Sequence, residues 1–115
     1  MEVGSMVKAI SFIKRKPGTR LEDFMEHYES VHAPLAMRHF PFKRYARNYI
    51  TAPPGLEGFD FDCITEVWFE TMEDCQAAAE FSVSEAYKVI SDDEEKFMDR
   101  TSIIAFLVEE KETLR

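Results

Sequence analysis

The sequence predicts an α+β fold in which four strands form an antiparallel sheet and helical segments connect them in the order βαββαβ. Three observations support it. Four segments alternate as strands do, other segments repeat apolar residues at helical spacing, and turn-forming residues separate them. This order is the ferredoxin-like pattern. A chain of 115 residues suffices for one domain with a small core, which we expect over residues 6–109, between a flexible lead at 1–5 and a polar tail at 110–115.

Four segments have strand periodicity, at residues 7–15, 42–51, 63–69 and 101–108. Several of them are apolar on both faces, whereas the helices of a ferredoxin-like fold cover only one face of the sheet. A second apolar face is a liability in a monomer, so we predict a homodimer that packs sheet against sheet. Phe12 or Phe106, with Trp68, is expected on that second face, where the dimer would enclose a small-molecule pocket.

The first helix is predicted to begin at Thr19, which forms a capping box with Glu22 after the turn Lys16-Pro17-Gly18. Its apolar stripe is long, but Pro34 disfavours helical geometry in the residue before it. We therefore expect this helix to end or kink near His32.

Further helical structure is predicted in the second half of the chain. Thr71 caps a helix that runs to about residue 80, and helical structure restarts at Ser82. Residues 92–95 are acidic and are expected to form a turn or a helix start.

The charge balance excludes several partners. The 14 basic and 22 acidic residues give a net charge of −8, and no basic stripe is available for nucleic acid or an anionic membrane. The longest apolar run, residues 103–108, is far too short to span a bilayer. Cys63 and Cys75 form neither a zinc nor a redox motif and read as buried apolar residues, so we expect a cytoplasmic protein.

His32 and Glu66 are the candidate catalytic residues. His32 lies on the apolar stripe of the first helix, where burial favours a neutral ring and the helix end favours a charged one, a balance suited to proton transfer. Its alternative role is to bond a backbone carbonyl at the helix end. Glu66 alternates with apolar residues in a central strand, so it either acts as an acid or base or forms an ion pair, for instance with an arginine.

Other polar residues are weaker candidates. Asn48 is the better pocket donor of the second strand, and Tyr45 lies on the opposite face of that strand, where packing is its ordinary role. His27 and His39 are expected to be solvated. We expect no metal site, because the three histidines include no i, i+4 pair and no carboxylate is placed as their partner at helical metal spacing.

Four segments together resemble the EthD domain, in order and in register over about residues 7–108. They are Phe12-x-Lys14-Arg15-Lys16-Pro17-Gly18-Thr19 continuing through Asp23-Phe24 and Tyr28 to His32-Ala33-Pro34-Leu35, then Arg44-Tyr45-x-x-Asn48, Thr65-Glu66-Val67-Trp68-Phe69, and Asp93-Glu94-x-x-Phe97-x-Asp99.

The resemblance implies a dimeric α+β barrel, in which the sheets of two ferredoxin-like halves form one barrel and each half holds a pocket. The resemblance implies that the family's recurring histidine corresponds to His32. Its recurring asparagine, glutamate and tryptophan correspond to Asn48, Glu66 and Trp68. Relatives in the wider superfamily include polyketide cyclases, lyases, isomerases, quinone-forming monooxygenases and haem-degrading enzymes. Many of them need no metal or organic cofactor, and we expect none here.

Three functions follow as hypotheses. The first is a cofactor-independent lyase, cyclase or isomerase that transfers a proton on a small apolar or aromatic metabolite, with His32 and Glu66 as the catalytic groups. The alternative is a non-catalytic small-molecule-binding or accessory subunit of an oxygenase or degradation pathway. The third is haem binding, with which an inward histidine is compatible. The residues expected to contact the substrate are Asn48, Trp68, Tyr45, Phe12 and Phe106.

Overall fold

The computed structural model describes residues 6–115 and arranges four antiparallel strands in one sheet of order β2-β3-β1-β4. The strands are β1 (Val7–Ile13), β2 (Arg44–Tyr49), β3 (Cys63–Phe69) and β4 (Ile104–Val108). The two central strands, β1 and β3, pair along their whole length, so that Ile10 lies opposite Glu66 on one side and Phe106 on the other. The predicted α+β ferredoxin-like order is confirmed. The lead predicted at residues 1–5 lies outside the described residues.

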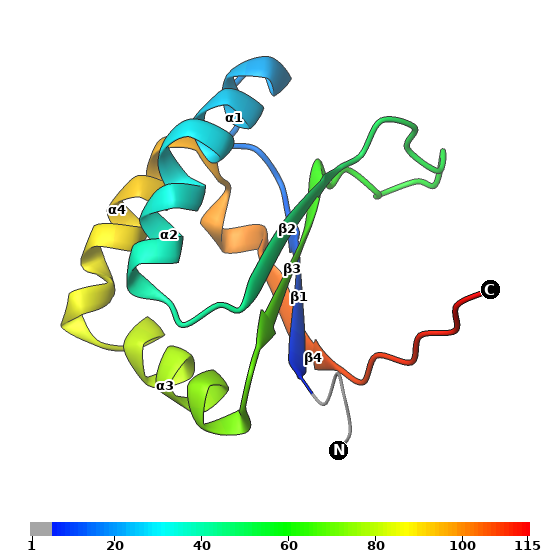
Figure 1. Cartoon of the computed structure of the whole chain (residues 1–115). Helices are drawn as coiled ribbons and strands as arrows, with labels where there is room; N and C mark the ends of the chain where they lie inside the picture. Colours follow the sequence, from blue (N-terminus) through cyan, green and yellow to red (C-terminus); the bar gives the residue numbers. More distant parts are fainter. Residues whose placement is uncertain (1–5) are drawn as a thin grey trace.

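The helices all cover the same face of the sheet, as Figure 1 shows. They are α1 (Leu21–His27), a π-helical turn η1 (Tyr28–His32), α2 (Ala33–His39), α3 (Met72–Ser82) and α4 (Lys88–Phe97), with short 3-10 turns η2 (Glu85–Tyr87) and η3 (Arg100–Ser102). The core forms between this layer and the sheet. Its buried members include Ile13, Phe24, Tyr28, Phe97 and Met98. None of the helices of residues 6–115 lies over the opposite face of the sheet.

The first helix begins one residue later than predicted. Arg20, not Thr19, is its N-cap, and no side chain caps it. Gly18 takes a positive φ of 84°, which bends the chain so that the Thr19 N–H bonds the Lys16 carbonyl oxygen at 3.0 Å. The predicted capping box is wrong because the turn that precedes the helix already uses Thr19.

The same helix does not end at His32. A single π-helical turn, Tyr28–His32, precedes Pro34, and α2 then continues to His39. A proline ring clashes with the carbonyl four residues before it, and the wider π turn relieves that clash while Pro34 sits at the start of α2. The extra residue also rotates the buried stripe, so that His32 and Ala36 are buried and Val31 is exposed.

The acidic segment at residues 92–95 lies inside α4 and is neither a turn nor a helix start. The buried face of α4 consists of Ile90, Asp93, Glu94 and Phe97, which follow one another at helical spacing. Two carboxylates therefore point toward the core from this helix. The predicted cap of α3 is confirmed, since the Thr71 hydroxyl accepts a hydrogen bond from the Asp74 N–H at 3.0 Å.

Candidate functional site

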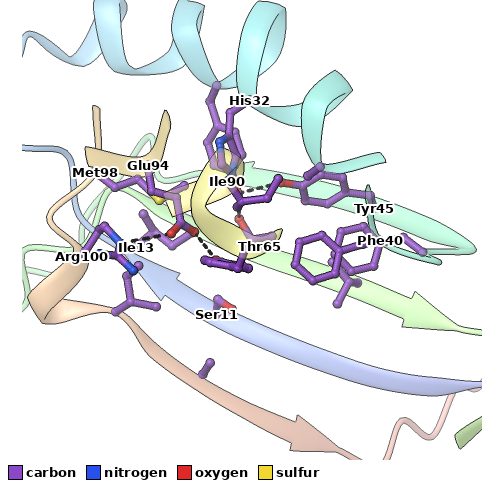
Figure 2. A pocket seen from close by; sticks show the side chains of 17 residues that line it. Ser11, Ile13, His32, Phe40, Tyr45, Thr65, Ile90, Glu94, Met98 and Arg100 are labelled. Atoms are coloured by element: carbon purple, nitrogen blue, oxygen red, sulfur yellow. Dashed lines mark hydrogen bonds and ion pairs between the residues drawn. The ribbon is translucent and has the colours of Figure 1, made fainter. Parts of the chain in front are cut away.

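A cavity of about 290 Å³ lies between the sheet and the helix layer. This size is at the low end of the range for small-molecule sites, roughly 300–1,000 Å³. Figure 2 shows its walls, which come from all four strands or their flanks and from η1, α2 and α4. Most lining side chains are apolar or aromatic; the polar ones are Ser11, Tyr28, His32, Tyr45, Thr65, Tyr87, Glu94 and Arg100.

His32 lines this cavity and is held from behind by Asp93. The ring is 3% exposed, and its Nδ1 lies 2.8 Å from a carboxylate oxygen of Asp93. Because an ionised carboxylate only accepts hydrogen bonds, Nδ1 carries the proton and Nε2 has the free lone pair. Within residues 6–115, no fully buried side-chain nitrogen or oxygen lacks a hydrogen-bond partner. Nε2 forms none of the hydrogen bonds found there, so it is not fully buried, and the ring that bears it lines the cavity.

Burial lowers the pKa of His32 from its ordinary value, and the hydrogen bond with Asp93 opposes that shift. The ring is therefore neutral at neutral pH and ready to accept a proton on Nε2. The alternative role predicted for His32, a bond to a backbone carbonyl, is not what the structure contains, since the partner of Nδ1 is a carboxylate.

A chain of hydroxyl groups runs from Tyr28, on the same π-helical turn as His32, to the sheet. Tyr45 donates to the Tyr28 hydroxyl at 3.2 Å, and the Tyr28 and Thr65 oxygens are 2.7 Å apart. Burial raises the pKa of Tyr45 to about 12 and that of Tyr28 well above its usual value, so both phenols stay neutral. Neutral hydroxyls can rotate to donate or accept, which suits this chain to a substrate oxygen.

Replacing Tyr28 by phenylalanine tests how much this hydroxyl chain stabilises the fold. The change removes the hydrogen bonds of the Tyr28 hydroxyl with both Thr65 and Tyr45 and leaves Thr65 only its weak contact with the Cys63 thiol, so we expect the free energy of unfolding to fall by about 1–2 kcal/mol. Tyr45→Phe is the matched control, because it removes only the longer outer bond and should cost less than about 1 kcal/mol. Urea unfolding of the two variants and the parent chain measures both values. Equal losses would contradict this account.

Tyr87, Glu94 and Arg100 form a polar cluster in the wall of the cavity, and Figure 2 labels two of them, Glu94 and Arg100. The Glu94 carboxylate accepts from the Tyr87 hydroxyl at 2.9 Å and from Arg100 Nε at 3.2 Å. Tyr87 and Arg100 also line a more open and more polar depression on the surface. The three side chains therefore lie between the apolar cavity and this solvent-exposed depression.

Glu66 and Asn48, predicted to act with His32, lie on the other face of the sheet. Glu66 accepts from Asn48 Nδ2 at 2.8 Å and forms an ion pair with Lys8 at 2.6 Å. The ammonium of Lys8 is the main cause that holds the pKa of Glu66 below its usual value. The structure thus contains the ion pair that was the alternative interpretation of Glu66, with a lysine in place of an arginine.

Phe12, Trp68 and Phe106 share this open face with Glu66. Phe12 and Phe106 meet edge to face at 5.7 Å, while Trp68 lies between Lys8 and Glu110 through a cation–π contact and a 3.0 Å hydrogen bond. Of the predicted site residues, only His32 and Tyr45 line the cavity. The cavity of the single chain is on the helix side of the sheet, not on the open face where sequence reasoning expected it.

Sequence reasoning missed Asp93, which joins two histidines. Its second oxygen lies 2.9 Å from His27 Nε2, so His27 is not simply solvated as predicted. The signal was present in the helical spacing of Ile90, Asp93 and Phe97, which places an acid in the middle of an apolar face. Among the described residues, no group of three or more His, Cys, Asp or Glu side chains is placed to hold a metal ion.

The comparisons place the chain in a family. The profile of the EthD domain matches residues 16–101, most of the chain. The chain belongs to the EthD family. The predicted resemblance is therefore confirmed, and His32, Tyr45 and Asp93 all fall inside the matched EthD segment. A search of curated proteins found no match.

Solved structures show the same fold as this EthD chain. An ethyl tert-butyl ether D family protein from Bacillus halodurans is 25% identical, with a TM-score of 0.67 over 92% of this chain and 99% of that one. A protein from Arabidopsis thaliana is 18% identical, with a TM-score of 0.65 over 95% and 99%. A dimeric ferredoxin-like protein of unknown function from Thermobifida fusca is 12% identical, with a TM-score of 0.62 over 94% of each chain. No helix within residues 6–115 could cross a membrane.

Proposed function

We propose that this EthD-family protein is a cofactor-independent enzyme that moves a proton on a small apolar or aromatic substrate, with His32 as the base. One observation carries the proposal: His32 lines an apolar cavity with its Nε2 free of any hydrogen bond to residues 6–115, while Asp93 holds its Nδ1 at 2.8 Å. A base needs this combination of a free lone pair, a fixed tautomer and a neutral ring near neutral pH.

The proposed reaction uses two groups of side chains: His32 with Asp93 moves the proton, and the hydroxyl chain stabilises the charge on the substrate. His32 Nε2 takes a proton from a carbon or oxygen of the substrate, and the carboxylate of Asp93 stabilises the imidazolium that forms. The electron pair left behind moves onto a substrate oxygen, where the Tyr45 hydroxyl can donate to it once Tyr28 donates in turn. In an isomerisation, His32 then returns the proton to a different atom of the substrate. In a lyase reaction it gives the proton to the leaving group, and in a cyclase reaction it gives the proton to the oxygen that bond formation leaves charged.

The cavity also limits the substrate class. Aromatic and aliphatic walls favour a flat apolar skeleton, and the volume of about 290 Å³ limits its size. The hydroxyls of Tyr45, Tyr28 and Thr65 favour a carbonyl or phenolic oxygen at one end. We infer a small enolisable ketone or phenol as the substrate.

The proposed assembly is a homodimer through the open faces of two sheets. Ile104 and Phe106 are exposed on that face, and Phe12 packs beside Phe106. Dimeric proteins from Bacteroides fragilis and Thermobifida fusca share the fold, which supports a dimer here. The cavity needs no residue from the partner, since a single chain supplies all of its walls.

Proton abstraction is measured directly as hydrogen–deuterium exchange. Small aromatic ketones and phenols with acidic C–H groups are incubated with the protein in D₂O, and loss of their proton signals is followed by NMR. We expect exchange with the parent chain and a fall of about a hundredfold in His32→Gln. His39→Gln is the matched control, because His39 stacks on Phe81 and does not line the cavity.

The alternative, a non-catalytic binding module, gives a different result in the same experiment. A ligand that binds the cavity with no exchange above the background rate, and with equal rates in the parent chain and His32→Gln, would rule out the base. Line broadening or saturation transfer on the ligand reports binding in the same samples.

A further inference from the structure

We propose that His27 is a positioning residue that keeps His32 unprotonated by competing with it for the single carboxylate of Asp93. The two rings lie on α1 and η1, and each bonds a different oxygen of that carboxylate, at 2.9 Å for His27 and 2.8 Å for His32. The proposal deepens the proposed function and rests on His32 being the base. The competition itself is a property of the folded chain and can be measured without a substrate.

The two histidines differ in their access to water. The His27 side chain is 24% exposed, whereas that of His32 is 4% exposed and faces the cavity. Solvent can stabilise a charge on His27 much better than a charge on His32. A charge on His27, when it forms, is balanced by Asp93.

A proton on His32 then meets an unfavourable site. Protonating His32 when His27 is charged places two cations on one carboxylate, and the charge on His27 acts to lower the pKa of His32. A base whose protonation is suppressed in this way stays active at a lower pH than it would alone. Asp93 holds the His32 ring in place. His27 adjusts how strongly the Asp93 carboxylate stabilises a proton on His32.

Other charged groups lie near His27 and His32, and their influence on His32 must be distinguished from that of His27. Lys96 Nζ lies 3.8 Å from the same Asp93 oxygen as His27, and Glu94, which is paired with Arg100, acts on His32 from the cavity side. Lysine, arginine and glutamate ordinarily titrate far from the range in which histidine does. The charges of these three groups stay constant while the histidines titrate. They therefore shift the titration of each histidine but do not make one titration depend on the other.

The test is a ring-by-ring titration by NMR in the full-length protein, with the His32 signals assigned from His32→Gln. In the parent chain we expect a two-step titration of His32, and in His27→Gln a single step with its midpoint at least about half a unit higher. Lys96→Gln is the matched control, because it removes a cation beside Asp93 and should leave the two steps in place. An unchanged His32 midpoint in His27→Gln would overturn the proposal.

A second pair of variants keeps the result unambiguous. In an Asp93→Asn background, adding His27→Gln should no longer move the His32 midpoint, because the shared carboxylate is gone. A shift of the same size in that background would also overturn the proposal, since it would show that Asp93 does not carry the coupling. Circular dichroism checks that each variant folds; if Asp93→Asn does not, His27→Gln and Lys96→Gln decide the question alone. Absence of exchange activity in the parent chain, with the coupling intact, would instead count against the proposed base.

Discussion

A glutamate in place of Phe106 should prevent the proposed homodimer from forming. Phe106 is 42% exposed on the open face of the sheet and meets Phe12 edge to face, and Phe12 in turn contacts Phe61 at 5.4 Å. A two-fold dimer encloses this apolar surface and would bury the new carboxylate twice, once from each copy. Each unpaired charge costs several kcal/mol, so dimer affinity should fall by more than about a thousandfold.

Sedimentation velocity over a range of protein concentrations measures this change. Val83→Glu is the matched control, because Val83 is 86% exposed just after α3, in the helical layer that covers the opposite face of the sheet, and it receives the same added charge. We expect Val83→Glu to remain a dimer, since its carboxylate stays in water. A parent chain that is already monomeric, or a Phe106→Glu protein that still forms dimers, would contradict the sheet-to-sheet assembly. Far-UV circular dichroism confirms that both variants fold.

The polar groups of the open face can be enclosed in such a dimer at low cost. Lys8 is buried already and bonds both Glu66 at 2.6 Å and Glu110 at 2.8 Å, while Asn48 donates to Glu66 at 2.8 Å. Glu110 belongs to the segment predicted to be a polar tail, yet it folds back over Trp68. Because these groups satisfy one another within one chain, a partner need only cover them. This arrangement explains Glu66 without any catalytic role.

Local patterns were sufficient to predict the fold. Strand alternation assigns each side chain to a face. The structure places both Phe12 and Phe106 on the open face, where one or the other was predicted beside Trp68, and places Tyr45 and Asn48 on opposite faces of the sheet as predicted. Such patterns depend on the chirality and pleat of a few consecutive residues. Family resemblance also indicated His32, which lines the cavity.

The site itself was harder to predict because its parts meet only in the tertiary structure. Asp93 lies 61 residues beyond His32 in sequence and reaches it through the packing of α4 against η1. The π-helical turn rotates the helix by one residue, so an ordinary helical wheel misplaces Val31, which is exposed. Without these facts the second apolar face, which a dimer would enclose, was the natural place to expect a pocket, and the cavity lies on the other side of the sheet.

Replacing Asp93 by alanine should lower the free energy of unfolding by roughly 2–4 kcal/mol at neutral pH. The change removes the acceptor of two histidine N–H groups, and the one on His32 is buried, so it loses its hydrogen bond inside the protein. Asp92→Ala is the matched control on the same helix, since Asp92 forms only an exposed ion pair with Lys88 and should cost less than about 0.5 kcal/mol. Urea unfolding at pH 7 measures both, and similar values for the two variants would contradict a supporting role for Asp93.

Acidification should enlarge the difference between the Asp93→Ala variant and the parent chain. Because burial lowers the pKa of His32 in the folded state, the unfolded chain binds a proton first, and stability is lost as the pH falls below about 6.5. The hydrogen bond with Asp93 opposes that lowering, so its removal depresses the pKa of His32 further and extends the loss to lower pH. Unfolding curves between pH 7 and pH 5 should therefore diverge, with Asp93→Ala falling faster. Parallel curves would show that Asp93 does not act on His32.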